Sequence, residues 1–141
     1  MSDTEDVYIC ESAAVEDGGM GVRFPVRAFG ADATGFVVRY RGAVYAYLNR
    51  CAHVPIELDW SKGEFFESSK LYLMCSTHGA IYVPETGACA GGPCRGGKLR
   101  PIALRETGDR IYWQPDQYIR PPVQDLTDSR TGSPSPGIYE R

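Results

Sequence analysis

The sequence predicts an all-β fold of antiparallel strands followed by an extended C-terminal tail. Three observations predict it. Short runs of β-branched and aromatic residues alternate with turns rich in Gly, Pro and Asp, and no segment of the 141 residues has the apolar periodicity of an amphipathic helix. Two of these runs are separated by only two residues, as in a β-hairpin. The hydrophobic content of 43% is enough for the core of one modest domain.

Each predicted strand is a run of β-favouring residues bounded by turn residues. In chain order the runs are 7–10, 22–27, 35–40, 43–48, 71–74, 81–83, 98–104 and 110–113. Pro25 places the second run at a sheet edge, because proline cannot donate a ladder hydrogen bond. Arg41 and Gly42 join the third and fourth runs into the predicted hairpin. The segment 57–70 is polar with several aromatic residues, which we expect to pack this insert onto the sheet.

The composition changes after residue 113. Pro, Ser, Thr, Asp and Gly dominate from there to the C-terminus, a composition that opposes a packed core. We therefore expect a domain at 1–113 and a Pro-rich extended tail at 114–141. The tail is either a solvated strap lying partly on the domain, or an arm that anchors a partner or a second copy through 118–119 or 138–139.

Charge and composition exclude several classes of protein. The net charge of −3 provides no basic face for nucleic acid. No apolar run approaches the roughly 18 residues that indicate a transmembrane helix, so we expect no membrane association. The acidic, polar N-terminus is unlike a secretory signal, and we expect a cytoplasmic protein.

The residues with metal-binding chemistry lie in two short stretches, Cys51-Ala52-His53 and Cys75-Ser76-Thr77-His78. Each offers one thiolate and one imidazole, and together they use both His of the chain. Two thiolates with two imidazoles suit either a [2Fe–2S] cluster with mixed ligands or a tetrahedral zinc ion. Zinc motifs more often pair Cys with Cys and His with His, so the spacing favours the cluster.

Further short motifs follow in a fixed order. Gly79 comes directly after His78, and Thr86-Gly87 and Gly92-Pro93 follow. With C-x-H and C-x-x-H, they make residues 49 to 104 resemble the soluble Rieske-type [2Fe–2S] proteins, although the stretch between the two pairs is a few residues longer than in compact Rieske ferredoxins. The resemblance implies a Rieske-type antiparallel β-sandwich or barrel with a cluster-binding subdomain. Its cluster-binding loops would be 49–56 and 75–80, with a covering loop at 90–97.

The resemblance also implies roles for single residues. Cys51 and Cys75 would bind the inner iron as thiolates, and His53 and His78 would each bind the outer iron through one ring nitrogen. The two imidazoles would face solvent and the redox partner. Four more residues would tune or cover the cluster: Tyr82, Gly79, Gly92 and Pro93.

Three of the five Cys are not needed as ligands. Cys10 lies in a predicted strand and is expected to be a small apolar residue rather than a reactive thiol. Cys89 and Cys94 flank the Gly-Gly-Pro turn and could form a disulfide. We expect free thiols instead, because a cytoplasmic protein is kept reduced.

The expected function is electron transfer by one [2Fe–2S] cluster, in a ferredoxin-like carrier or a redox subunit for a partner oxygenase or reductase. With both His used as ligands, the chain has none left for the 2-His-1-carboxylate iron site of an oxygenase. A non-catalytic carrier is therefore favoured over a self-contained enzyme. An iron–sulfur sensor or accessory protein, or a structural zinc module, are the alternatives.

We predict a reduction potential well below the upper end of the Rieske range of roughly −150 to +300 mV. The high-potential members of the Rieske family that this chain resembles have a hydroxyl two residues after the second His, where this chain has Ala80. They also join the two loops by a disulfide, at positions that are Ile56 and Thr77 here. A redox titration followed by absorbance tests this, and a midpoint near the upper end would contradict it.

Overall fold

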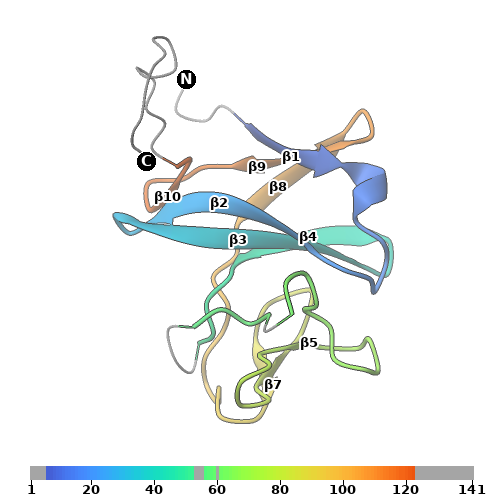
Figure 1. The fold of residues 1–141 in the computed structure, drawn as a ribbon, viewed down its shortest axis with the longest axis vertical. Helices are drawn as coiled ribbons and strands as arrows, with labels where there is room; N and C mark the ends of the chain where they lie inside the picture. Colours follow the sequence, from blue (N-terminus) through green and yellow to red (C-terminus); the bar gives the residue numbers. More distant parts are fainter. Residues whose placement is uncertain (1–5, 53–55, 60, 123–141) are drawn as a thin grey trace.

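The described chain forms three antiparallel sheets and one short helical turn (Figure 1). The computed structural model describes residues 6–52, 56–59 and 61–122. In this part of the chain the only helix is the 3-10 helix η2 (Ser12–Ala14), and none is long and apolar enough to cross a membrane. The predicted all-β class is confirmed.

The largest sheet has the strand order β10-β2-β3-β4. Its strands are β10 (Ile119–Arg120), β2 (Val22–Ala28), β3 (Ala31–Tyr40) and β4 (Ala43–Leu48). The predicted hairpin is present, with Tyr40 opposite Ala43 and Gly35 opposite Leu48. Arg41 and Gly42 have φ values of 52° and 87°. Two successive residues with positive φ give the turn that matches the twist of paired strands.

Strand β10 lies inside the segment expected to be an extended tail. Ile119 and Arg120 pair with Ala28 and Arg27 of β2, and the Ile119 side chain is buried in the domain. The packed part of the chain thus continues past residue 113, and Ile119 packs on the domain of the same chain. Because β10 reaches only the end of β2, Pro25 lies on the uncovered stretch of that strand, where a missing N–H costs nothing. Residues 123–141 lie outside the described residues.

The second sheet, β1-β9-β8, consists of β1 (Val7–Glu11), β9 (Arg110–Gln114) and β8 (Ala103–Thr107). The third, β5-β6-β7, consists of β5 (Leu73–Met74), β6 (Ile81–Tyr82) and β7 (Cys89–Gly91). Strand β7 was not predicted, because its three residues have little β propensity and are fixed by pairing with β6. The predicted strand at 98–104 begins only at 103, and the residues before it make isolated bridges.

Strands β3 and β4 separate two hydrophobic cores. Successive strand residues point to opposite faces, so Phe36 and Val38 enter one core while Val37 enters the other. Tyr47 and Leu48 of β4 divide in the same way. The core with Val37 fills the sandwich against β9 and β10, and the core with Phe36 contains Cys51 and Cys75.

The smallest sheet and its loops form a subdomain at one end of the sandwich (Figure 1). The chain enters it from β4 and returns along residues 98–102 to β8. The returning segment is fixed to β4 by two backbone hydrogen bonds, from Leu48 N to Arg100 O and from Ile102 N to Ala46 O, both 2.9 Å. The entry and exit of the subdomain are therefore attached to the same strand.

Candidate metal centre

Two loops of matching construction present the two candidate Cys ligands. In the first, the Cys51 N–H donates to Ile56 O at 2.8 Å, and in the second the Cys75 N–H donates to Ala80 O at 2.8 Å. Each hydrogen bond spans five residues and closes its loop on the Cys. Gly79, which directly follows His78, has a φ of 75°, and this conformation lets the second loop turn back.

The two Cys side chains are buried next to each other. Cys51 is 3% exposed and Cys75 is fully buried, and both belong to the core that contains Phe36. Burial raises the pKa of the Cys75 thiol, as does the neighbouring Cys51, while the backbone N–H groups of Thr77 and His78 lower it. Two adjacent buried thiolates require a cation between them, so this donor set fits a thiolate-binding metal.

Tyr82 is the third member of this buried group. Its hydroxyl oxygen accepts a hydrogen bond from Ala52 N at 3.0 Å and lies 3.2 Å from Cys51 Sγ. Because the oxygen already accepts from a backbone N–H, the hydroxyl proton is available to the sulfur. Burial raises the pKa of Tyr82, and the contact with Cys51 raises it further, so the hydroxyl remains protonated and can donate.

The expected His ligands are only partly within the described structure. His78 is exposed at the end of the second loop, whereas His53 lies outside the described residues. In residues 6–52, 56–59 and 61–122, no three His, Cys, Asp or Glu side chains are close enough to hold one metal ion. In a Rieske-type cluster each iron takes two protein ligands, the two sulfurs on one iron and the two imidazoles on the other, so a group of three side chains around one ion is not required.

The loop expected to cover the site packs against both Cys loops. Gly92 has a φ of 84°, and a Cβ there would lie 3.0 Å from Ala80 Cα and from Gly79 O. A Cβ on Gly97 would lie 2.9 Å from the Cβ of Ala52. Only glycine permits these approaches. Pro93 is exposed at the tip of this loop.

Cys89 and Cys94 form a disulfide, so the expectation of two free thiols is wrong. Their Cα atoms are 5.6 Å apart, within the range that a disulfide spans. The Gly-Gly-Pro turn between them brings the two together over a sequence separation of five. Cys10 is half-buried against the sandwich core, and burial raises the pKa of its thiol, which fits an unreactive residue.

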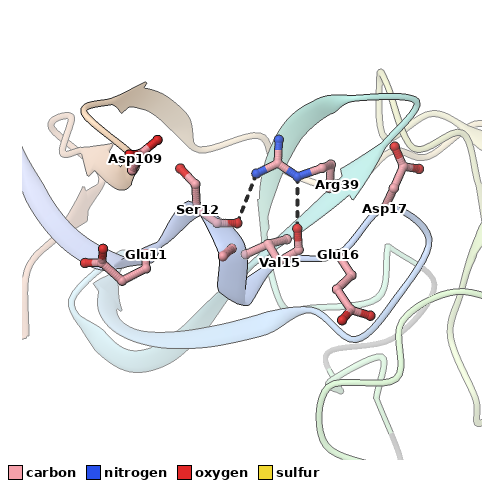
Figure 2. A pocket seen from close by; sticks show the side chains of 8 residues that line it. Glu11, Ser12, Val15, Glu16, Asp17, Arg39 and Asp109 are labelled. Carbon is pink, nitrogen blue, oxygen red and sulfur yellow. Dashed lines mark hydrogen bonds between the residues drawn. The ribbon is translucent and has the colours of Figure 1, made fainter.

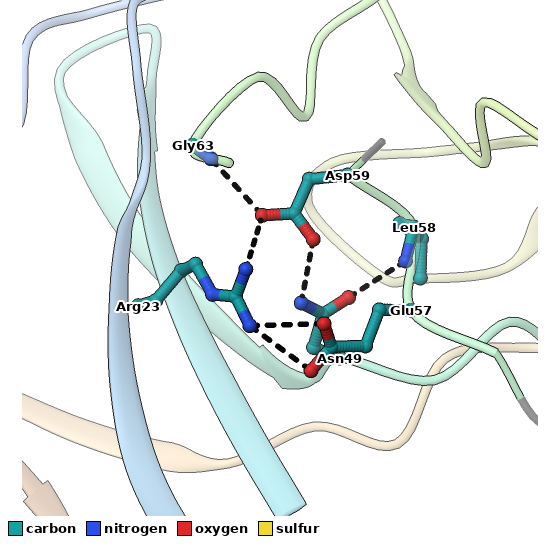
Figure 3. A network of polar contacts seen from close by, with 6 residues as sticks. All are labelled: Arg23, Asn49, Glu57, Leu58, Asp59 and Gly63. Carbon is teal, nitrogen blue, oxygen red and sulfur yellow. Dashed lines mark hydrogen bonds and ion pairs between the residues drawn. The ribbon is translucent and has the colours of Figure 1, made fainter. Parts of the chain in front are cut away.

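A buried polar network, which the sequence analysis missed, fixes both ends of the first loop (Figure 3). Asn49 accepts a hydrogen bond from Leu58 N at 2.8 Å and donates to Asp59 Oδ1 at 2.8 Å. Asp59 also accepts from Gly63 N at 3.0 Å and forms an ion pair with Arg23 of β2 at 3.3 Å. Asn49 and Asp59 are the two buried polar residues of the described chain.

The network connects the residues before and after the loop 51–56 to the sheet. Arg23 extends it by donating to both carboxylate oxygens of Glu57, at 2.9 and 3.1 Å. Of the aromatic residues in the insert, Phe65 is fully buried and stacks on Phe36 with ring centroids 3.9 Å apart, which is the predicted packing role. Trp60 lies outside the described residues. One available signal for the network was a polar Asn directly after the apolar end of β4.

An open pocket lies elsewhere, beside η2 and the turn between β8 and β9 (Figure 2). There Arg39 donates to Val15 O at 2.9 Å and to Ser12 O at 3.2 Å, and forms an ion pair with Glu106 at 2.8 Å. None of the described residues that line this pocket is a candidate ligand. Arg39 therefore has a structural role in joining the two large sheets.

Comparisons with known proteins agree with this geometry. The model of the Rieske [2Fe-2S] domain family matches residues 5–105. No curated protein sequence matches the chain. Among solved structures, the ferredoxin of carbazole 1,9a-dioxygenase from Nocardioides aromaticivorans IC177 is similar with a TM-score of 0.63 and 26% identity. That match covers 79% of this chain and 98% of that one.

Two further structures share the fold at lower identity. The Sphingomonas yanoikuyae B1 ferredoxin is similar with a TM-score of 0.60 and 19% identity. The match covers 79% of this chain and 100% of that one. A chain in the complex of reduced oxygenase and oxidized ferredoxin in carbazole 1,9a-dioxygenase has a TM-score of 0.60 and 21% identity. It is matched over 92% of its length and 77% of this chain.

We predict that Asp59→Asn destabilises the protein by about 1–3 kcal/mol, because a neutral amide replaces one acceptor oxygen with a donor facing Asn49, Gly63 or Arg23. Urea unfolding of the cluster-loaded protein, followed at the cluster absorbance, measures this. Glu64→Gln is the matched control, since Glu64 is exposed and we expect a change within about 0.5 kcal/mol. Equal unfolding midpoints for both variants would refute the role of the network.

Proposed function

Because this chain belongs to the Rieske [2Fe–2S] domain family, we propose that it is an electron carrier that delivers single electrons to a partner oxygenase. The observation that carries the proposal is the pair of buried, adjacent Cys51 and Cys75 side chains at the ends of two matching loops. A bound [2Fe–2S] cluster supplies one-electron redox chemistry. The chain itself holds, shields and tunes it.

In the proposed ligand set, Cys51 and Cys75 hold the inner iron as thiolates, and His53 and His78 hold the outer iron. The difference in exposure supports this division. Both Cys lie in an apolar core that excludes water, whereas His78 lies at the surface where a partner can approach it. With the sulfurs buried and an imidazole edge exposed, the short path for an electron between the cluster and a partner runs through the imidazole side.

Two features of the protein would stabilise the ligand sulfurs. The Tyr82 hydroxyl is positioned to donate to Cys51, and the N–H groups of Thr77 and His78 are directed at Cys75. Donors near the sulfurs withdraw electron density and favour the reduced state of a bound cluster. The missing hydroxyl at Ala80 removes one such donor, which supports a potential well below the upper end of the range.

The partner is inferred from the similar structures. They include ferredoxins of oxygenase systems, one of them in complex with its oxygenase, which supports an oxygenase as electron acceptor. A reductase would then be the electron donor. The sequence also favours a cytoplasmic location, and a homo-oligomer formed through the C-terminal tail is the alternative to a tail that lies on its own domain.

We expect protein purified without oxygen to be brown, to contain iron and acid-labile sulfide in equal amounts, and to give an EPR signal once reduced. Cys75→Ser should lose the cluster, because its sulfur has no substitute in the core, while Cys10→Ser keeps it. Iron and sulfide analysis with EPR of the three proteins tests this. Colourless protein with bound zinc, or an intact cluster in Cys75→Ser, would overturn the ligand assignment.

A carrier is distinguished from a sensor by electron transfer itself. We expect the reduced protein to be reoxidised by the terminal oxygenase of a Rieske oxygenase system in stopped-flow absorbance measurements, and to be reduced by a flavin reductase of such a system. A sensor would exchange electrons with neither protein at a rate above that of buffer alone.

We expect Tyr82→Phe to lower the reduction potential, by on the order of tens of millivolts, since a hydrogen bond to an anionic sulfur favours the reduced state. Tyr47→Phe is the matched control, because Tyr47 is equally buried but its hydroxyl donates to Pro84 O at 2.8 Å, away from the sulfurs. Redox titration of both variants decides. Equal potentials for Tyr82→Phe and the unchanged protein would leave Tyr82 a packing residue only.

A further inference from the structure

The disulfide Cys89–Cys94 lies inside the structure that covers the candidate metal centre. Cys89 begins β7 and pairs with Tyr82, the residue whose hydroxyl reaches Cys51. Cys94 ends the turn that contains Gly92. The bridge thus closes the segment 89–94, whose Gly92 packs on the second Cys loop.

Both half-cystines are also connected to the first Cys loop. Cys89 N donates to Gly97 O at 3.0 Å, and Gly97 N donates to Cys94 O at 2.8 Å. Gly97 in turn packs against Ala52, the residue after Cys51. Breaking the disulfide would therefore affect residues that contact both Cys loops, and it could loosen the covering loop 90–97 from them.

The two half-cystines differ in exposure. Cys94 is 3% exposed within the core, whereas Cys89 is half-buried, so Cys89 is the residue of the bridge that is nearer to solvent. Arg95 and Lys98 are exposed close by in the sequence, and Lys98 pairs with Ala88 next to Cys89. Positive charge near a disulfide favours an attacking thiolate.

The fold also accommodates the reduced state. Cys94 Sγ lies 3.2 Å from Gly91 O and 3.5 Å from Ile81 O, and Cys89 Sγ lies 3.6 Å from Gly91 O. After reduction each thiol has a carbonyl acceptor already in place. Neither redox state leaves a buried polar hydrogen without a partner.

We propose that Cys89–Cys94 is a thiol–disulfide exchange site that takes a dithiol reductant, and that its redox state sets how firmly the covering loop holds the two Cys loops. A thiolate of the dithiol attacks Cys89 Sγ and breaks the S–S bond. Cys94 leaves as a thiolate and takes up a proton. The second thiol of the reductant then displaces Cys89, so the reductant becomes a disulfide as the protein gains two electrons and two protons.

Reduction removes the covalent closure of the segment 89–94, so the covering loop opens more often while the sheets remain folded. The effect on the cluster rests on the proposed function, because it requires that the loops at Cys51 and Cys75 hold iron. The exchange chemistry does not, and the two parts are tested separately.

The first experiment measures exchange by differential alkylation. Holoprotein prepared in air is incubated with or without dithiothreitol, quenched in acid, labelled with N-ethylmaleimide, fully reduced, and labelled with iodoacetamide. We expect Cys89 and Cys94 to carry the second label without dithiothreitol and the first label after it, while Cys10 always carries the first. Maleimide on Cys89 and Cys94 in untreated protein, or no maleimide on them after treatment, would overturn the proposal.

The second experiment measures the coupling. We expect reduction to speed hydrogen exchange at the Ala52 and Ala80 amides, and release of iron to a chelator, by roughly tenfold. The double variant Cys89→Ser/Cys94→Ser should show the faster rates without reductant and no further change with it. Cys10→Ser, the matched control, should behave like the unchanged protein.

Two results of the second experiment would refute the coupling. One is that the double variant and the reduced protein exchange at the rates of the oxidised protein. The other is that dithiothreitol acts equally on the double variant, which would place its effect on the cluster rather than on the bridge. Absence of iron from the untreated protein would instead refute the proposed function and leave the alkylation result standing.

Discussion

The structure depends on keeping two sulfur atoms side by side in an apolar interior. Cys51 and Cys75 come from loops that are distant in sequence, yet both are buried in one core. An isolated thiolate in such a place is unfavourable, and a second one beside it more so. In the proposed ligand set a bound metal would resolve this conflict, and the backbone N–H groups around Cys75 and the hydroxyl of Tyr82 would reduce it further. The same burial that raises the pKa of a thiol shields a bound cluster from water.

The largest sheet allows this burial in a small domain because both of its faces are covered by hydrophobic cores. Strands β3 and β4 pack the sandwich on one face and the metal-binding subdomain on the other, so one hairpin serves two cores. Phe36 illustrates the consequence, because it contacts both Tyr47 of the same sheet and Phe65 of the insert. The first Cys loop continues directly from β4, so pairing of β4 with β3 fixes the point at which the loop begins.

The segments around the centre have little regular structure and are held by other means. On one side, Asn49 and Asp59 satisfy backbone donors that no sheet reaches and connect the first loop to Arg23. On the other, glycines let the covering loop pack directly on both Cys loops, and the Cys89–Cys94 bridge closes that loop. The polar network is fixed once the protein is folded, whereas a disulfide has a second redox state. The covering side is thus the adjustable one.

Much of this protein was determined by its sequence alone. The order and spacing of the Cys and His motifs predicted a [2Fe–2S] cluster, and alternating β-rich runs gave the all-β class and the hairpin between β3 and β4, because these signals are local. Other features required tertiary contacts. Cys89 and Cys94 pair in the folded chain, against the expectation from compartment chemistry. Packing recruited Ile119 from the expected tail into the largest sheet, and Asp59, an ordinary surface residue by composition, became buried beside Arg23. Composition and spacing report what a residue can do, but only the folded chain decides which residues it meets, because those contacts join positions far apart in sequence.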